Sequence, residues 1–359
     1  MARSCLFTTA SAVVLTIASW NATAQDNTSG TPEQSDESKQ LSSLDPMVVT
    51  PTRTSRTVDS SLSSVTVIDD EEMRRQSPTE MSELLRAQPG VDVTSNGSYG
   101  KTTSVFMRGT GAESTMLMID GVRLRSATAG SPAWQFLPPA LIERVEIVRG
   151  PRGSLYGSDA VGGVVQMFTE PEEASGGWME AGGGSFNTSE IGAGFSSMED
   201  GTKLHLGFDR FRTGGTELRE DGDDLGYDNT AAKGGISHEF DNGAKLGING
   251  LRADGTTEFI GGRTDYLIQT SAARARLPVT SWWDTHLQVS EARDESTNFR
   301  GGAPSVFDTR SRMANWRNVM IIGDHEIVAG ADLRRDEVES TSDFEETERD
   351  NAAGFLQVL

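Results

Sequence analysis

From about Gly176 to the C-terminus, apolar and polar residues alternate over short stretches such as "KLHLGFDRF", "AKLGINGL" and "DTHLQVSEA". In the first stretch, Leu204, Leu206 and Phe208 fall on one face of an extended chain, and the residues between them fall on the other. This period of two predicts β-strands with one apolar and one polar face. We count about ten such strands, the last of which is "AAGFLQVL".

The links between these strands favour a membrane barrel over a soluble β-sandwich, which would show the same alternation. Tight links such as "MEDGT" and "FDNGA" alternate with long polar ones, which cover 212–228, 254–264, 293–309 and 335–350. Short turns at one end of the strands and long loops at the other are typical of outer-membrane β-barrels.

The segment from Ser64 to Thr169 predicts a compact domain of strands and helices. Strands are expected at "SVTVI", "TSVFMRG" and "TMLMIDGVRL", the last folded into a hairpin at Asp120-Gly121. A helix is expected over "SPTEMSELLRAQPG", capped by Ser77 and ended by the Pro-Gly pair. A strand, a glycine-rich loop and a further strand follow in "VEIVRGPRGSLYGSDAVGGVVQMFTE".

The N-terminus has the features of a secretory signal peptide. Arg3 precedes the apolar stretch "LFTTASAVVLTIASW", and "ATA" supplies a small-residue cleavage site before Gln25. We assign residues 1–24 to this signal peptide; the alternative is a short buried helix. The one cysteine, Cys5, lies in this segment, and the exported chain is therefore expected to carry no thiol or disulfide.

Composition narrows the class of protein. Hydrophobic residues make up 35% of the chain and the formal net charge is -21, which argues against a nucleic-acid partner. A membrane barrel tolerates such a polar composition, because only every second strand residue faces lipid. No apolar run approaches the roughly 18 residues of a membrane-spanning helix. The sequence has no nucleophile elbow, zinc-ligand spacing or phosphate-binding glycine loop, and its 4 histidines are scattered, so no enzyme is predicted.

A polar segment before the compact domain carries an isolated strand-prone fragment. Residues 25–44 are rich in Ser, Asp, Glu and Gln, and "DPMVVTPTR" follows them. Nothing in the neighbouring sequence is expected to pair with this fragment. An exposed strand on a polar tether can add itself to the sheet edge of another protein. The alternative is an ordinary first strand of the following domain.

These motifs resemble those of TonB-dependent outer-membrane transporters, and within that family the cobalamin (vitamin B12) receptor branch is most similar. The resemblance rests on "DPMVVTPTR", "LLRAQPGVDV", "VFMRG", "MLMIDGVRL" and "LIERVEIVRGPRGSLYGSDAVGGVV". It implies a disordered tether at 25–57 with a TonB box at 45–51, an α+β plug domain at 58–172, and the N-terminal part of an antiparallel transmembrane β-barrel at 173–359. The box residues would be Asp45, Met47, Val48, Val49 and Thr50.

The resemblance also implies energy-coupled import of a small molecule, here a corrinoid, across the outer membrane. The ligand would bind from outside, and the energy transducer TonB would pull on the box, which would face the periplasm. We expect a monomer embedded in outer-membrane lipid. By position, two plug loops, 95–104 and 125–135, would supply the ligand contacts Asn96, Lys101, Thr102, Ala127 and Thr128.

The same residues also allow other interpretations. Each of the five loop residues could belong to a solvated turn without a ligand. Lys101 stands where the cobalamin branch is expected to have a neutral amide. A ferric-siderophore or haem receptor, a non-transporting ligand-binding sensor and an inactive fragment are therefore the alternatives to a corrinoid transporter.

Arg108 in "FMRG" and Arg149 in "VRGP" end predicted strands. A buried guanidinium requires a carboxylate partner. In the family, these positions resemble the plug half of a lock formed with barrel glutamates. The alternative is a partner within the plug, such as Glu143 or Glu146.

The stretch "ELREDGDDLGYDN" concentrates acidic residues around two glycines. Calcium takes about six to eight oxygen ligands, which a flexible acidic loop can supply. In the resembling cobalamin receptors, a loop between the third and fourth barrel strands binds calcium. The resemblance therefore implies a Ca²⁺ site in the 220–228 loop, the alternative being a merely solvated loop. Its ligands would be Asp221, Asp223, Asp224 and Asp228.

Barrels of this family close with roughly 22 strands, whereas only about ten are expected here. We therefore expect this chain to be the N-terminal part of a longer receptor.

Overall fold

A computed structural model describes residues 47–48, 50, 52–54, 56–57, 63–172, 175–217, 222 and 224–359. These residues all belong to one unit, Asp45–Leu359. The expected signal peptide (1–24) and the tether up to residue 46 lie outside the described residues. Within the described residues, no helix is long and apolar enough to cross a membrane.

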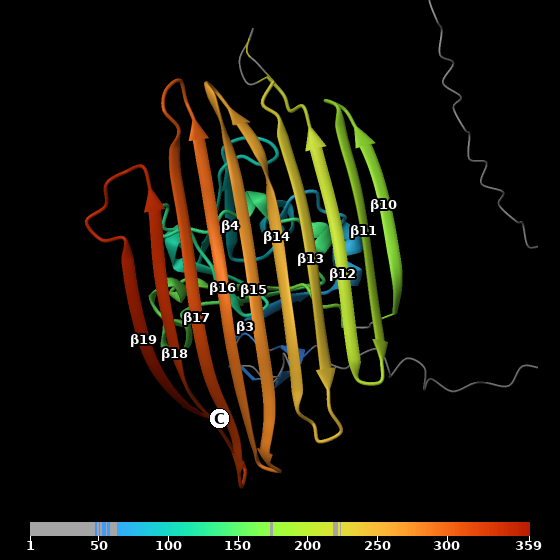
Figure 1. The fold of residues 1–359 in the computed structure, drawn as a ribbon, viewed down its shortest axis with the longest axis vertical. Coiled ribbons are helices and arrows are strands. Elements are labelled where there is room, and N and C mark those ends of the chain that lie inside the picture. The colour runs from blue at the N-terminus through green and yellow to red at the C-terminus, as the bar shows by residue number, and fades with distance from the viewer. Residues whose placement is uncertain are drawn as a thin grey trace, which may run out of the picture. The chain divides into compact units, whose positions relative to one another are not determined.

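Ten antiparallel strands form one sheet in which every strand pairs with its neighbours in the sequence (Figure 1). The strands are β10 (Ser175–Gly184), β11 (Thr188–Glu199), β12 (Thr202–Thr213), β13 (Tyr227–Glu239), β14 (Lys245–Phe259), β15 (Gly262–Thr280), β16 (Trp283–Phe299), β17 (Ser305–Ile322), β18 (His325–Ser340) and β19 (Glu348–Val358). The strand number and the antiparallel order confirm the prediction made from alternation.

The two faces of this sheet differ as the alternation predicts. On β12, Leu206 and Phe208 are 53% and 42% exposed, whereas His205 and Asp209 are buried. The buried face contacts the N-terminal domain: the side-chain amide of Asn229 donates to the carbonyl of Phe136 at 3.2 Å. An exposed apolar face of this kind is typical of the side that an outer-membrane barrel presents to lipid.

Three of the long loops expected from the sequence are shorter than predicted. In the loop expected at 335–350, β18 runs to Ser340 and β19 begins at Glu348. Strands β14 and β15 pair as far as Phe259↔Gly262, and β16 and β17 pair as far as Asn298↔Ser305. The expected loops at 254–264 and 293–309 are therefore mostly strand. Polar side chains in these segments pair with one another across neighbouring strands. For example, Arg293 forms an ion pair with Asp308 at 2.7 Å. Polar composition alone therefore did not show where strand pairing ends.

The N-terminal plug domain contains a five-stranded sheet in the order β3-β8-β9-β6-β7. Strands β6 and β9 are parallel, and the other neighbours are antiparallel. A separate hairpin is formed by β4 and β5. The elements are β3 (Ser64–Ile68), α1 (Asp70–Gln76), α2 (Met81–Arg86), β4 (Val91–Ser95), β5 (Thr103–Met107), η2 (Ala112–Ser114), β6 (Thr115–Ile119), β7 (Val122–Leu124), η3 (Trp134–Phe136), η4 (Pro139–Leu141), β8 (Arg144–Arg149), α3 (Gly153–Tyr156), η5 (Ser158–Ala160) and β9 (Gly163–Phe168).

The hairpin turn predicted at Asp120-Gly121 joins β6 to β7. Both residues have positive φ, 48° and 75°, as a two-residue turn of the primed type requires. The Asp120 carboxylate accepts bonds from the Thr169 backbone amide at 2.9 Å and from the Thr169 hydroxyl at 2.6 Å. This turn is therefore fixed to the end of the plug.

The prediction that Ser77 caps a helix is wrong. Ser77 instead ends α1 in the left-handed conformation, with φ 43°, and α2 begins only at Met81. The Glu83 carboxylate accepts a hydrogen bond from the Thr79 backbone amide at 3.0 Å. In a helix that began at Pro78, this amide would lie in the first turn and would need a capping side chain as its acceptor.

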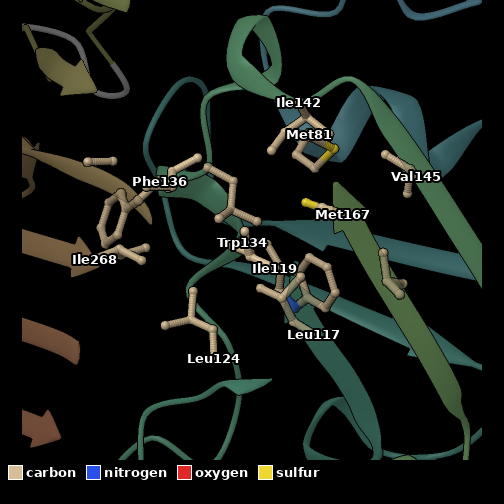
Figure 2. Packing of buried hydrophobic residues seen from close by; sticks show 14 of the residues in the cluster. Met81, Leu117, Ile119, Leu124, Trp134, Phe136, Ile142, Val145, Met167 and Ile268 are labelled. Atoms are coloured by element: carbon tan, nitrogen blue, oxygen red, sulfur yellow. The ribbon is translucent and has the colours of Figure 1, made fainter. Parts of the chain in front are cut away.

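The apolar core lies in the plug and continues onto the inner face of the sheet. Figure 2 shows Trp134 among Ile119, Leu117 and Leu124, and Phe136 beside Ile268. Phe136 also stacks on Tyr266 of β15 with ring centroids 3.6 Å apart. Burial of these side chains holds the plug against the ten-stranded sheet, which we call the wall. The stabilisation is roughly 25 cal/mol for each Å² of apolar surface removed from water.

The strand-prone fragment near the N-terminus is not unpaired, contrary to the expectation from sequence. Strand β1 (Met47–Val48) pairs with β2 (Arg56–Thr57) in a small antiparallel sheet. Arg53 has a positive φ of 61° where the chain reverses between them. A partner therefore comes from the polar sequence just downstream, where composition gave no sign of it.

Candidate functional site

The first plug loop predicted to contact ligand joins β4 to β5. The backbone amide of Asn96 donates to the carbonyl of Thr102 at 3.1 Å, which closes the loop. Both Asn96 and Thr102 are exposed. Their side chains are therefore available to a molecule outside the plug.

Lys101 in the same loop is only 6% exposed. Its ammonium group donates to the carbonyls of Tyr99 and Leu225 at 3.1 and 3.2 Å, and to the Thr257 hydroxyl at 3.1 Å. Burial lowers the pKa of Lys101, and the nearby carboxylates of Glu258 and Glu80 partly oppose this. The side chain thus anchors the loop to the wall beside the link between β12 and β13.

The second plug loop follows β7. The backbone amide of Ala127 donates to the Thr309 hydroxyl of β17 at 3.1 Å. The hydroxyls of Ser126 and Thr128 lie 3.0 Å apart. Ala127 is exposed and Thr128 is partly exposed. The two loops are thus held by different parts of the sheet, one beside β14 and the other beside β17.

Thr50 is completely buried against the plug sheet. Its backbone amide and its hydroxyl both donate to one oxygen of Glu146 on β8, at 2.8 and 2.5 Å. The hydroxyl also lies 3.1 Å from the amide oxygen of Gln166 on β9, and the Tyr156 hydroxyl donates to the Thr50 carbonyl at 3.0 Å. Every polar group of Thr50 is therefore satisfied by the plug.

The chain after Thr50 contacts both the plug and the sheet. The Arg53 guanidinium forms an ion pair with Asp332 of β18 at 3.0 Å. It also lies over the rings of Tyr156 and Phe355, 4.6 and 4.5 Å from their centroids. These contacts fix the position of the segment between β1 and β2.

Arg108 and Arg149 lie close together at the ends of β5 and β8. Burial, followed by the neighbouring charge of Arg108, lowers the pKa of Arg149. Arg149 donates to the Thr66 hydroxyl at 2.7 Å. Among the described residues, neither arginine forms an ion pair with a carboxylate, and a lock with barrel glutamates stays a prediction.

The acidic loop is described only in part. Asp221 and Asp223 lie outside the described residues, and Asp224 is exposed. Asp228 forms an ion pair with Arg210 at 3.1 Å. Within the part of the chain that the structure describes, the carboxylates of this loop do not form a cluster of metal-ligand size.

Comparison with known proteins identifies the domain that carries these loops. Residues 57–164 match the TonB-dependent Receptor Plug Domain. The chain carries the plug domain of the TonB-dependent receptors. It is 33% identical over 331 residues to the vitamin B12 transporter BtuB of Photobacterium profundum, a match that covers 88% of this chain and 54% of that transporter.

Two further comparisons extend the likeness beyond the plug. The vitamin B12 transporter BtuB of Vibrio vulnificus is 26% identical over 343 residues, covering 89% of this chain and 55% of that transporter. The structure of Pseudomonas aeruginosa FpvA bound to heterologous pyoverdines matches with a TM-score of 0.70 and 14% identity, over 84% of this chain and 46% of that one. The receptor chain thus spans about half the length of the curated relatives it matches.

The predicted TonB box is only partly described. Asp45 and Val49 lie outside the described residues. Met47 is 47% exposed, whereas Val48 and Thr50 are completely buried. Two of the three described residues of the predicted box are therefore buried.

Sequence reasoning missed several polar residues that join plug and wall in this receptor. Asp159, in the glycine-rich loop, contacts Arg123 at 3.2 Å and Arg334 of β18 at 3.7 Å. Asp120 accepts from the Asn249 amide of β14 at 2.6 Å. No local pattern marks these pairs, because their partners lie far away in the sequence.

Proposed function

We propose that this protein is a TonB-dependent, energy-coupled outer-membrane receptor that imports a corrinoid of the cobalamin type. The observation that carries the proposal is the 33% identity to a vitamin B12 transporter over 88% of the chain. That match extends through both the plug and the sheet, and so includes both parts that would surround a ligand.

The geometry supports a gated mechanism. The exposed residues Asn96 and Thr102 and the partly exposed Thr128 lie on plug loops that also contact the wall. A ligand that binds these loops would either weaken or strengthen the hydrogen bonds between the loops and the wall. TonB would bind the box by strand addition, which requires the backbone of Val48 and Thr50 to leave the plug. Release of Thr50 from Glu146 is therefore the step that exposes the box.

The ligand class is tested by binding of radiolabelled cyanocobalamin to outer membranes that contain the protein. We expect saturable binding that unlabelled cobalamin displaces and that ferric enterobactin and haem do not. Displacement by either iron compound would instead assign the protein to the siderophore or haem receptors. Absence of saturable binding would overturn the corrinoid proposal.

Energy coupling is tested separately, in cells with and without a functional TonB system. Surface binding of labelled cobalamin should persist in both strains, whereas accumulation inside the cell should require TonB. Binding without accumulation in either strain would indicate a ligand-binding sensor. The same experiment on fractionated membranes shows whether the protein is located in the outer membrane.

We also propose that the 220–228 loop binds Ca²⁺ and orders the ligand site. The support is its acidic composition and the exposed carboxylate of Asp224; Asp228 would have to exchange its contact with Arg210. The variant Asp224→Asn should lower cobalamin affinity in calcium to the level that the wild type shows with a chelator. Equal affinity with and without calcium in the wild type would refute this role.

A further inference from the structure

Three carboxylates come together on the plug-facing side of the first three strands of the sheet. They are Glu180 of β10, Glu190 of β11 and Asp209 of β12, and one ligand oxygen from each lies within 4.8 Å of the others. The register explains the meeting, because Glu180 pairs with Gly192 and Gly192 pairs with Asp209. The two outer carboxylates thus flank a position that has no side chain.

The glycine at this position keeps the space between the carboxylates open. A Cβ atom on Gly192 would lie 2.8 Å from Glu180 Oε1 and 2.9 Å from Cζ3 of Trp178. Both distances are below ordinary contact, and any larger residue would displace these side chains. The carboxylate of Glu180 and the indole of Trp178 therefore both lie against Gly192.

Asp209 is the buried member of the group. It is 4% exposed, and its Oδ2 atom has no hydrogen-bond partner among the described residues. Over the same part of the chain, no lysine or arginine forms an ion pair with any of the three acids. A buried ionised carboxylate beside two others is unfavourable unless one of the acids takes up a proton or a cation joins them.

We propose that Glu180, Glu190 and Asp209 bind a divalent cation that prefers oxygen ligands, such as Ca²⁺. Three carboxylates supply the charge and the hard donors that such an ion takes, and water would complete its coordination. A cavity of about 680 Å³ between plug and wall is lined by Glu180 and Glu190, which gives the ion a path of entry. This site is separate from the 220–228 loop, and it does not depend on which molecule the receptor imports.

The position of Trp178 provides a direct test. Terbium replaces calcium at oxygen sites, and its luminescence is excited by a nearby indole. Purified receptor, stripped of metal with a chelator, is titrated with Tb³⁺ under excitation of tryptophan. We expect sensitised emission that Ca²⁺ displaces, and a rise in the unfolding temperature of the receptor when Ca²⁺ is added.

Matched variants separate this site from any other. Asp209→Asn and Glu190→Gln should each lose the emission and show a smaller calcium-dependent rise than the wild type. Trp178→Phe should lose the emission alone, and Asp224→Asn, in the acidic loop, should keep the emission. If Asp209→Asn does not fold, Glu190→Gln decides, since Glu190 is only partly buried. Unchanged emission in Glu190→Gln, or no effect of Ca²⁺ on the wild type, would overturn the proposal.

Discussion

Thr50 donates two hydrogen bonds to a single oxygen of Glu146, one from its backbone amide at 2.8 Å and one from its hydroxyl at 2.5 Å. The two residues are 96 positions apart and both are completely buried. Hydrogen bonds to a charged acceptor in a buried place are stronger than neutral ones. This contact links the predicted TonB box to the plug sheet, and we expect it to contribute to the free energy required to expose the box.

Replacement of Thr50 by Val should make release of the predicted box from the plug easier. The side chain keeps nearly the same size but loses its hydroxyl group. The loss of one hydrogen bond to a charged group is worth about 2 kcal/mol, which is roughly a thirtyfold change in the opening equilibrium. The measurement is maleimide labelling of Val48→Cys, in a Cys5→Ser background, because Val48 is buried while the box is docked. The labelling rate should rise in the Thr50→Val variant.

Thr52→Val is the matched control for this experiment. The hydroxyl of Thr52 donates only locally, to the Thr54 carbonyl at 3.1 Å, and labelling should stay close to that of the parent. If both variants label at the same rate, the contact between Thr50 and Glu146 does not limit exposure of the box.

Replacement of Lys101 by Met should release the first plug loop from the wall. The variant leaves the carbonyls of Tyr99 and Leu225 without the ammonium donor that they share in the wild type. Hydrogen exchange of the amides in residues 96–102 should therefore become faster. Lys245→Met is the control, since the Lys245 side chain is 42% exposed and lies 3.8 Å from Glu170. Equal protection in both variants would show that other contacts hold the loop.

Acid should weaken the attachment of the glycine-rich loop through Asp159. Burial alone would raise the pKa of Asp159, but the guanidinium groups of Arg125, Arg123 and Arg334 outweigh it and lower the pKa below the ordinary 3.8. A folded-state pKa below the unfolded value means that the stabilisation is fully present above pH 3.8 and is lost as the pH falls through the folded-state pKa. The measurement is the unfolding midpoint between neutral pH and pH 2.

Asp159→Asn isolates this contribution. Removal of one partner from this partly buried ionic cluster should cost about 1–3 kcal/mol at neutral pH. The variant should also show a smaller decrease of the unfolding midpoint in acid than the wild type. A parallel decrease in both proteins would mean that other carboxylates cause the acid sensitivity.

Replacement of Trp134 by Ala should destabilise the plug strongly. Trp134 is completely buried among apolar side chains (Figure 2), and removal of a buried tryptophan typically costs about 3–5 kcal/mol. Thermal unfolding of this variant is compared with that of Trp282→Ala, whose side chain is 46% exposed. The exposed replacement should change stability by about 0.5 kcal/mol or less. Equal losses would place the cooperative core elsewhere.

The order of elements was predictable from the sequence because it depends on local patterns. Alternation of the kind seen at Leu204, Leu206 and Phe208 predicted the ten strands and their apolar face. The pleat of a strand alone determines on which face of the sheet each side chain lies. The turn at Asp120-Gly121 was equally local, because few residue pairs adopt positive φ at low cost.

The tertiary structure alone decided which buried polar groups meet. The pairing of β1 with β2, the contact of Thr50 with Glu146, and the meeting of Glu180 with Asp209 join residues whose neighbours give no sign of a partner. Such contacts arise from strand register and from docking of the plug on the wall. A buried polar group must have a hydrogen-bond partner, because leaving it unpaired is energetically costly. Only the fold determines which residue that partner is.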